Sequence, residues 1–340
     1  MLTNLLQRNV SFLIFFTAYV VVLSGLVVVG DAPWEYVWGG VIQRLSGLST
    51  KWNPLLDERL PRIVVLLLSG ASLATAGASM QALFQNPLAS PNILGLSSGG
   101  SLATVIVLAF GWHFHFPLLL PLAATCGSLA TILLVYGFAR SRGIFSNLHV
   151  ILTGIAFSSV LVAIQQSLLY ILRDHWELIQ TVTEWEAGTS FDRSWHHVNM
   201  QLPLTFLGLI GCYHYRREMN VIALGEEEAS LLGVNLPQVR WRLILCISLL
   251  TGSALAGIGP IAFFGLLLPH IVRKFIGFDH RRVILYCIFA GSLVMAGMDL
   301  LIRLCSITLF TMGNISSLIG GLFFLTLLLK KEDPCSKLGA

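Results

Sequence analysis

Hydrophobic residues gather along this chain in long runs that short polar segments separate. A helix needs about 20 apolar residues to cross the hydrocarbon core of a bilayer, and ten runs approach that length. They cover residues 10–30, 62–82, 93–111, 116–138, 149–171, 200–215, 242–258, 260–276, 283–303 and 314–329. The pattern predicts an all-α polytopic membrane protein with about ten transmembrane helices, in a single domain over residues 1–340.

We expect the first run to be a retained span rather than a cleaved signal peptide. It is longer than the apolar region of a signal peptide, and Arg8 is the one cationic side chain that precedes it. No convincing small-residue cleavage site stands before Asp31.

The distribution of positive charge predicts the orientation. With the N-terminus in the cytosol, most of the 21 Lys and Arg residues fall on cytosolic segments, as the positive-inside rule requires. Ten crossings then place both termini in the cytosol.

The run at residues 260–276 leaves two alternatives open, because it is short and contains Pro269. It is either a short, broken span or a re-entrant segment. A re-entrant segment would place Arg273, Lys274, Arg281 and Arg282 outside and reverse everything that follows, so the charge rule favours the broken span.

Composition supports a membrane protein and excludes a soluble one. Charged residues make up 11% of the chain and hydrophobic residues 55%, whereas about a quarter of a soluble domain is charged. The six cysteines form no C-x-x-C pair, so we expect neither a disulfide framework nor a metal site. Membrane lipid is the expected surrounding, and no nucleic acid is expected as a partner.

Two glycine-rich segments resemble each other and predict an inverted internal repeat. "GASLATAG" at residues 70–77 and "GSALAGIG" at 252–259 share the pattern G-x-x-L-A-x-x-G. In the predicted topology they run in opposite directions, which is typical of transporters. The alternative is that close helix packing alone selects Gly and Ala at this spacing.

The spans contain few groups that could drive transport. Asp299 and His270 are the ionisable residues that lie near apolar runs without a flanking charge cluster, whereas an ion-coupled carrier needs buried polar sites for its coupling ion. The chain has no Gly-Lys dipeptide and therefore no phosphate-binding loop of the G-x-x-x-x-G-K type. A separate ATPase is the natural source of energy, and no His, Ser and Asp arrangement indicates a hydrolase.

The longest cytosolic loop, at about residues 216–241, predicts a short helix. Glu226, Glu227 and Glu228 favour the positive end of a helix dipole, and Gly233 can end the helix. Such a helix either docks in a partner's groove or lies solvated at the membrane surface.

Three blocks of this sequence resemble the permease subunits of bacterial type II ABC importers for ferric siderophores, haem or cobalamin. They are "RLPRIVVLLLSGASLATAGASMQALFQNPLASPNILGLSSG" at 59–99, "ALGEEEASLLGVNL" at 223–236 and "GPIAFFGLLLPHIVRKFIGFDHRR" at 259–282. A smaller segment, "WEAGTSFDRSW" at 185–195, is similar to the W-x-x-G-S segment of these permeases.

The resemblance implies an assembly in the bacterial cytoplasmic (inner) membrane. Two permease subunits, identical or different, pair around a central pathway, bind two ATPases on the cytosolic side, and receive substrate from a periplasmic or lipid-anchored binding protein. ATP and Mg²⁺ are then held by the ATPases, with no cofactor on this chain. The resemblance assigns ATPase coupling to Gly225, Glu226, Glu227, Glu228, Ala229, Ser230, Leu231, Leu232 and Gly233.

The resemblance also assigns a docking role to three outward-facing arginines, Arg59, Arg62 and Arg303. The guanidinium group can hold a carboxylate of the binding protein with two parallel hydrogen bonds, which a lysine cannot do. Two alternatives remain: Arg59 and Arg62 anchor the second span at the lipid headgroups, or Asp57 and Glu58 pair with them in the resting state.

Substrate identity is the least determined property. The last span lacks the Glu and the two Pro residues that relatives carry, and has Gly320 and Gly321 instead. The inner constriction of the family aligns with Asn147 and Leu148. We expect an iron(III)–siderophore complex as substrate, with cobalamin or haem as alternatives. The rival from another class is an ion-coupled secondary transporter that uses Asp299.

Overall fold

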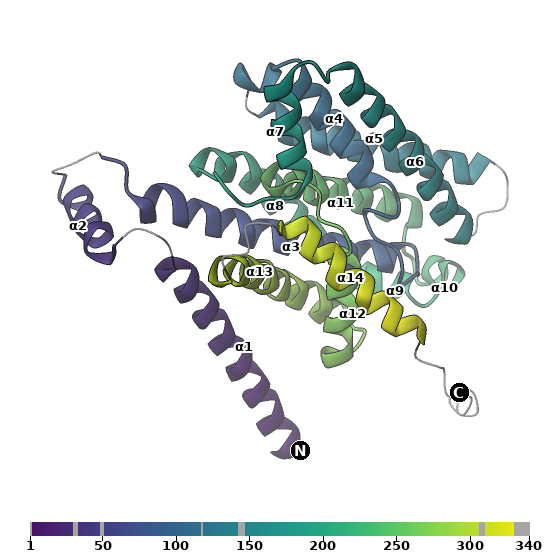
Figure 1. Ribbon diagram of the computed structural model, residues 1–340. Helices are drawn as coiled ribbons and strands as arrows, with labels where there is room; N and C mark the ends of the chain where they lie inside the picture. Colours follow the sequence, from purple (N-terminus) through teal and green to yellow (C-terminus); the bar gives the residue numbers. More distant parts are fainter. Residues whose placement is uncertain are drawn as a thin grey trace.

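The computed structural model describes residues 2–29, 33–47, 51–116, 118–141, 147–305 and 310–329. Within these ranges every regular element is helical. The helices form a bundle from which α1 and α2 extend at one side (Figure 1). The all-α prediction is therefore confirmed for the described part of the chain.

Each of the ten predicted runs lies on a helix. These helices are α1 (Leu2–Val28), α3 (Leu60–Leu83), α4 (Leu96–Ala109), α5 (Leu119–Ser141), α6 (Asn147–Ile171), α8 (Trp195–His214), α11 (Leu236–Ile258), α12 (Phe264–Ile276), α13 (His280–Leu304) and α14 (Met312–Leu329). Five described stretches are long and apolar enough to cross a membrane: Pro54–Leu83, Leu119–Ala139, His149–Ile171, Leu236–Ile258 and His280–Leu304. The count of ten crossings and the side of each terminus stay predictions.

Several short elements join these helices. They are α2 (Trp34–Leu45), the π-helix η1 (Pro54–Arg59), the 3₁₀-helix η2 (Trp112–Phe114), α7 (Trp176–Glu186), α9 (Arg216–Ile222) and α10 (Glu226–Leu231). Of these, α10 was predicted from its sequence. Helices α9 and α10 lie at the opposite end of the bundle from α2 and the start of α3 (Figure 1). Following the predicted orientation, we call the end with α9 and α10 the inner end and the end with α2 the outer end.

Helix α3 is the centre of the bundle. In the apolar stretch Pro54–Leu83, which contains α3, 83% of the most apolar part is buried inside the protein. The corresponding share for His149–Ile171 of α6 is 17%. Glycines allow this packing: a Cβ atom at Gly70 would overlap the carbonyl group of Gly291 on α13, and one at Gly77 would overlap Gly265 on α12. Small residues at such crossings let helix backbones approach closely and gain dispersion contacts.

Hydroxyl groups join α3 to two further helices. Thr205 on α8 lies 3.2 Å from Ser72 on α3 and donates to Ser253 on α11 at 3.0 Å. All three side chains are buried. Because lipid offers no hydrogen-bond partners, polar side chains in spans satisfy each other at helix crossings.

The segment before α12 explains how a short helix fits into the bundle. Thirteen residues at about 1.5 Å each give roughly 20 Å, less than the ~30 Å hydrocarbon core. Residues 259–263 before α12 are not helical, and the carbonyl groups of Ile261 and Ala262 accept hydrogen bonds from Asn92 (3.1 Å) and Ser316 (2.6 Å). Buried irregular backbone is stable in a membrane protein when it is satisfied in this way. Whether the segment crosses the membrane as a broken span or re-enters it is not tested by these contacts, so the crossing stays a prediction.

The two glycine segments of the predicted repeat make similar contacts. Gly70 meets α13 at Gly291, and Gly252 meets α5 at Thr125, in each case where an added Cβ would overlap the backbone of the neighbouring helix. Close packing of this kind fits both the repeat and the small-residue alternative, so the inverted repeat stays a prediction.

We predict that Gly77→Ala destabilises the protein strongly, because the new Cβ would overlap backbone rather than a movable side chain. Overpacking of this kind typically costs about 1–3 kcal/mol. The thermal unfolding midpoint in detergent measures the effect. Gly137→Ala on α5 is the control, since nothing lies within 4 Å of its added Cβ. Equal midpoints for the two variants would contradict the prediction.

Candidate functional site

At the outer end, three helical and loop elements meet at one carboxylate. Asp299 of α13 is fully buried. Its Oδ1 accepts hydrogen bonds from Nη2 of Arg62 on α3 and from Oγ of Ser190 in the α7–α8 loop, both at 2.5 Å. Its Oδ2 lies 2.9 Å from Nε of Arg303, one turn further along α13. We call these four residues the outer arginine cluster.

The outer arginine cluster is covered from outside. Arg62 is 6% exposed, and its guanidinium carbon lies 4.5 Å from the centre of the Phe191 ring, a cation–π contact. Nε of Arg62 and Nη2 of Arg303 are buried without a hydrogen-bond partner among the described residues. The cluster therefore carries more positive than negative charge and keeps donors that no acceptor satisfies.

Arg59 has a different role from the one expected of a surface cation. It is 4% exposed, and its Nη1 donates to the carbonyl oxygens of Val27 (2.7 Å) and Val28 (3.3 Å). These carbonyl groups lie at the C-terminal end of α1, where no backbone N–H of the same helix donates a hydrogen bond to them. Arg59 thus caps α1, and the C-terminal dipole of that helix favours its charge.

The structure corrects one alternative for the resting state. Asp57 pairs with Arg44 of α2 at 2.5 Å, and Glu58 is exposed, so neither acid is the partner of Arg62. The partner is Asp299, which lies far away in the sequence. Arg59 and Arg62 are buried and Arg303 is partly buried. All three bind groups of this chain, and their docking role stays a prediction.

Arg193 is a further cation near the outer arginine cluster that the sequence analysis did not select. It donates from Nη2 to the carbonyl oxygen of Thr189 at 3.2 Å. Burial lowers the pKa of Arg193 to about 10, the nearby charge of Arg62 acts in the same direction, and Asp192 opposes them. Arg193 therefore remains charged at neutral pH.

At the inner end, the predicted short helix is confirmed as α10. Gly225 precedes it with φ +139°, and an added Cβ there would overlap the Glu228 carboxylate. Glu226 forms an ion pair with Arg240 of α11. After the helix, Gly233 adopts φ +82°, a left-handed conformation that ends a helix and that glycine adopts without strain.

Helix α10 presents leucines to its surroundings. Ala229 is fully buried, whereas Leu231 is 88% exposed and Leu232 is 64% exposed. Leu224, just before the helix, is also exposed. Three leucines are therefore exposed to the surroundings at or beside α10.

Helices α9 and α10, residues 216–231, which we call the inner segment, are tied to the two helices that carry the arginines of the outer arginine cluster. Gln85, just after α3, donates to the carbonyl oxygen of Ile222 at 2.6 Å. Asn220 of α9 donates to Asp279 and accepts from the backbone N–H of His280, both at 2.7 Å. The hydrogen bond from Asn220 is the main reason that the pKa of Asp279 is lowered. Helix α9 is thus hydrogen-bonded to the residue that follows α3 and to the residues that begin α13.

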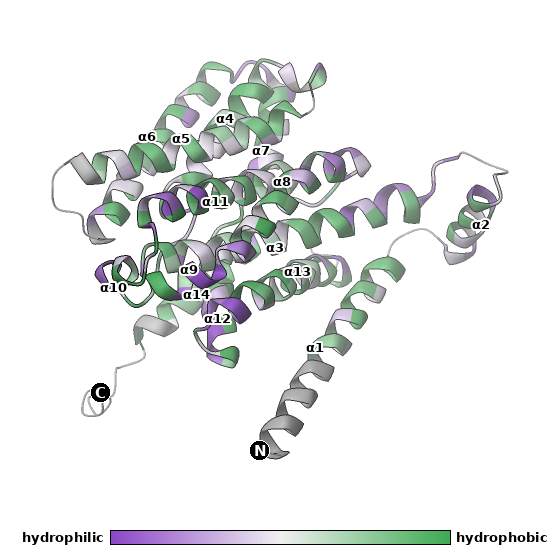
Figure 2. Ribbon diagram, turned by 180° about the vertical axis from the view of Figure 1, so that it is seen from behind, coloured by the Kyte–Doolittle hydropathy of each residue, from purple (hydrophilic) through white to green (hydrophobic). Residues whose placement is uncertain are grey.

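Polar residues concentrate around α9, α10 and the end of α12, whereas the bodies of the long helices are hydrophobic (Figure 2). The predicted inner constriction lies at the start of α6, but the side chains of Asn147 and Leu148 are outside the described residues. Of the last span, Gly320 packs against the Phe263 side chain, which an added Cβ at this position would overlap.

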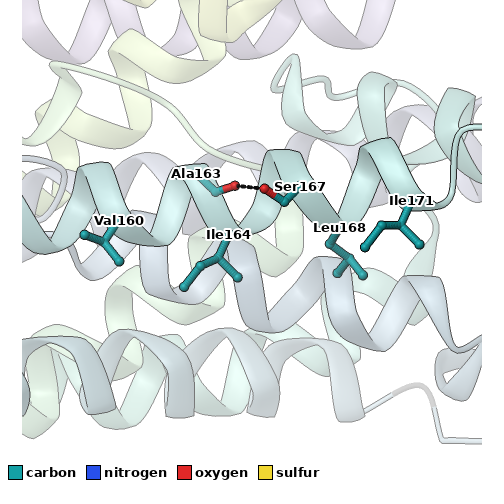
Figure 3. A pocket seen from close by; sticks show the side chains of 6 residues that line it. All are labelled: Val160, Ala163, Ile164, Ser167, Leu168 and Ile171. Atoms are coloured by element: carbon teal, nitrogen blue, oxygen red, sulfur yellow. Dashed lines mark hydrogen bonds between the residues drawn. The ribbon is translucent and has the colours of Figure 1, made fainter.

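Helix α6 carries an open apolar groove of about 520 Å³ (Figure 3). Its lining residues are Val160, Ala163, Ile164, Ser167, Leu168 and Ile171. Ser167 is the polar member, and its hydroxyl donates to the carbonyl oxygen of Ala163 in its own helix at 2.8 Å. The groove therefore offers apolar contact and no charge.

Comparisons with known proteins point to one family. The profile of the FecCD transport family matches residues 14–330. The hemin transport system permease protein HmuU of Yersinia pestis is 35% identical over 84% of this chain and 86% of its own. The Fe(3+) dicitrate transport system permease protein FecD of Escherichia coli is 33% identical over 81% and 85%. The vitamin B12 import system permease protein BtuC of Vibrio vulnificus is 34% identical over 93% and 95%.

A solved structure agrees with these relatives. A metal-chelate type ABC transporter in an inward-facing conformation matches with a TM-score of 0.78 and 26% identity. The match covers 93% of this chain and 97% of that chain. The similarity therefore extends over almost the whole fold.

We predict that Asp299→Asn destabilises the protein, because it leaves the buried Arg62 and the partly buried Arg303 without a counter-charge. Breaking a buried ion pair typically costs about 3–5 kcal/mol. The thermal midpoint in detergent measures the loss, and Asp174→Asn is the control, since Asp174 is 90% exposed and lies 3.9 Å from Arg173. An unchanged midpoint for Asp299→Asn would show that the pair contributes nothing to stability.

Proposed function

The chain belongs to the FecCD transport family, and from this membership we propose that it translocates an iron(III)–siderophore complex across the bacterial cytoplasmic membrane. Relatives across this family are permease subunits of ABC importers. In our proposal the chain performs no covalent chemistry, and ATP and Mg²⁺ are bound by a separate ATPase. The observation that carries the proposal is the inner segment, which joins an exposed apolar helix to α3 and α13.

The inner segment suits contact with an ATPase. Leu231, the last residue of α10, and Leu232, directly after it, are exposed, and Gly225 and Gly233 flank the helix. A short helix with apolar anchors fits a groove in a partner. Two permease subunits would each place one α10 on one of two ATPases. Closure of the ATPases on ATP would then tilt α3 and α13 through the hydrogen bonds of Gln85 and Asn220.

The outer arginine cluster suits contact with a substrate-binding protein. Its guanidinium groups keep donors without acceptors, and a carboxylate is the group that a guanidinium fork binds best. We propose that acidic residues on a periplasmic or lipid-anchored binding protein reach Arg59, Arg62 and Arg303 once the Phe191 loop has moved.

The exposed face of α6 suits the second permease subunit. In the stretch His149–Ile171, 17% of the most apolar part is buried within this chain. The groove on this helix is lined by no charged side chain. We propose that a second permease, identical or related, packs beside this face, and that the substrate passes between the two subunits.

The ion-coupled alternative is not supported by the site. Asp299, the acid on which it depends, is fully buried and bound by two arginines and a serine. A coupling ion would have to displace a guanidinium group to reach this carboxylate. The cobalamin and haem alternatives, by contrast, are represented among the relatives.

We predict that replacing the exposed leucines of α10 releases the ATPase. Leu231→Asp with Leu232→Asp places charge where an apolar contact is expected, so the ATPase should no longer co-purify with the tagged permease. Leu118→Asp is the control, an exposed leucine outside α10. ATPase recovered at normal stoichiometry with the double variant would refute the docking role.

We predict that a strain without this chain loses uptake of ferric siderophores. A panel of radiolabelled ferric siderophores, haem and cobalamin measures the loss, with an inactivated ATPase as a second strain. Loss of cobalamin or haem uptake with normal siderophore uptake would replace the proposed substrate. Uptake that survives without the ATPase would contradict ATP-driven transport altogether.

A further inference from the structure

Helix α2 presents an apolar stripe that no described part of the chain covers. Trp34, Trp38, Ile42 and Leu45 follow one another at helical spacing, and their exposed fractions lie between 38% and 82%. The rings of Trp34 and Trp38 are in edge contact, with centroids 5.8 Å apart. A stripe this rich in large side chains is unusual on a surface that faces water.

The adjoining side of α2 is fixed to the outer end of the bundle. Val37 and Val41 are buried against Leu55 of η1. Arg44 of α2 pairs with Asp57 of η1. These contacts hold α2 in one orientation, so the exposed stripe is a property of a fixed helix.

Asn53 links α2 to η1 by its side chain. Its Nδ2 donates to the carbonyl oxygen of Val37 at 3.0 Å, and its Oδ1 accepts from the backbone N–H groups of Leu55 and Leu56. A Cβ at Gly40 would overlap the Asn53 amide, so Gly40 is what permits this close approach. Helix α2 and η1 thus form one unit.

The position of α2 in the chain restricts what can cover the stripe. Helix α1 ends at Val28 and α2 begins at Trp34, and the apolar stretch Pro54–Leu83 follows soon after. Both neighbouring stretches are predicted spans, so α2 lies at the level where these two helices would leave the bilayer. Figure 1 shows it beyond the start of α3, beside the bundle rather than within it.

The chemistry of the stripe matches the boundary between headgroups and acyl chains. Tryptophan is enriched at that boundary because its ring is apolar and its N–H is polar, and Trp52, just after α2, is exposed as well. Polar positions of the same helix, Glu35 and Gln43, are exposed too. A helix with this division of side chains lies in the plane of the interface.

We propose that α2 is a membrane-surface anchor whose Trp34, Trp38, Ile42 and Leu45 side chains insert among the lipids of the outer leaflet. Through Asn53 and the Arg44–Asp57 pair, the anchor sets the depth of η1 and therefore of Arg59. The proposal concerns the bilayer contact alone and does not depend on the transported substrate.

Tryptophan fluorescence tests the proposal in the full chain with its partner subunits, reconstituted into lipid nanodiscs. The Trp34→Phe/Trp38→Phe variant keeps the apolar stripe and removes two reporters, so subtracting its emission from that of the wild type isolates the two α2 rings. Nanodiscs with acyl chains brominated near the headgroup probe lipid contact, and iodide probes water contact. Trp176→Phe on α7 is the matched control for loss of an exposed ring.

The proposal expects brominated lipid to quench the difference emission and iodide to leave it almost unchanged. Quenching by iodide but not by brominated lipid would place the stripe in water and overturn the proposal. Resistance to both quenchers would show that a second copy or another protein covers the stripe, which also overturns it. None of these results depends on transport activity, so they are independent of the proposed function.

Discussion

The buried contact between Arg62 and Asp299 is the interaction on which the arrangement of this protein depends. It joins the outer ends of α3 and α13, while Gly70 and Gly291 bring the same two helices together further along. At the inner end, Gln85 and Asn220 connect this pair to α9. The helix pair therefore connects both candidate sites, and in the proposed mechanism a tilt imposed at one end would reach the other as movement of packed elements.

A buried ion pair is weak as a source of stability, since desolvation offsets most of the Coulombic attraction. Its value here lies in geometry. Ser190 and Arg303 bind the same carboxylate as Arg62, so Asp299 fixes the position of two helices and one loop at once. Apolar residues of equal volume would hold the helices together, but they would not orient two guanidinium groups toward the same side.

The sequence predicted the long helices because each is a continuous apolar run, and it predicted α10 because acidic residues and a glycine mark its ends. It did not reveal α2 or α7, whose apolar residues alternate with polar ones in short segments. It selected Arg59, Arg62 and Arg303, but not their surroundings. The partner of Arg62 is Asp299, which lies 237 residues further along the sequence. Asp57, which is close to Arg62 in the sequence, is bound to Arg44 instead. Such pairings depend on tertiary packing, which local sequence does not contain.

The covered state of the outer arginine cluster restricts how a binding protein can engage it. Phe191 lies on Arg62, and Ser190, its neighbour, is bound to Asp299, so a carboxylate from outside reaches Arg62 only after this loop moves. The apparent affinity of such a partner is reduced by the fraction of molecules in which the loop is open. In the proposed docking, binding at this cluster and rearrangement of the outer ends of α3 and α13 would therefore be one linked equilibrium. A signal of substrate delivery would then arise at Asp299, where the loop and both helices meet.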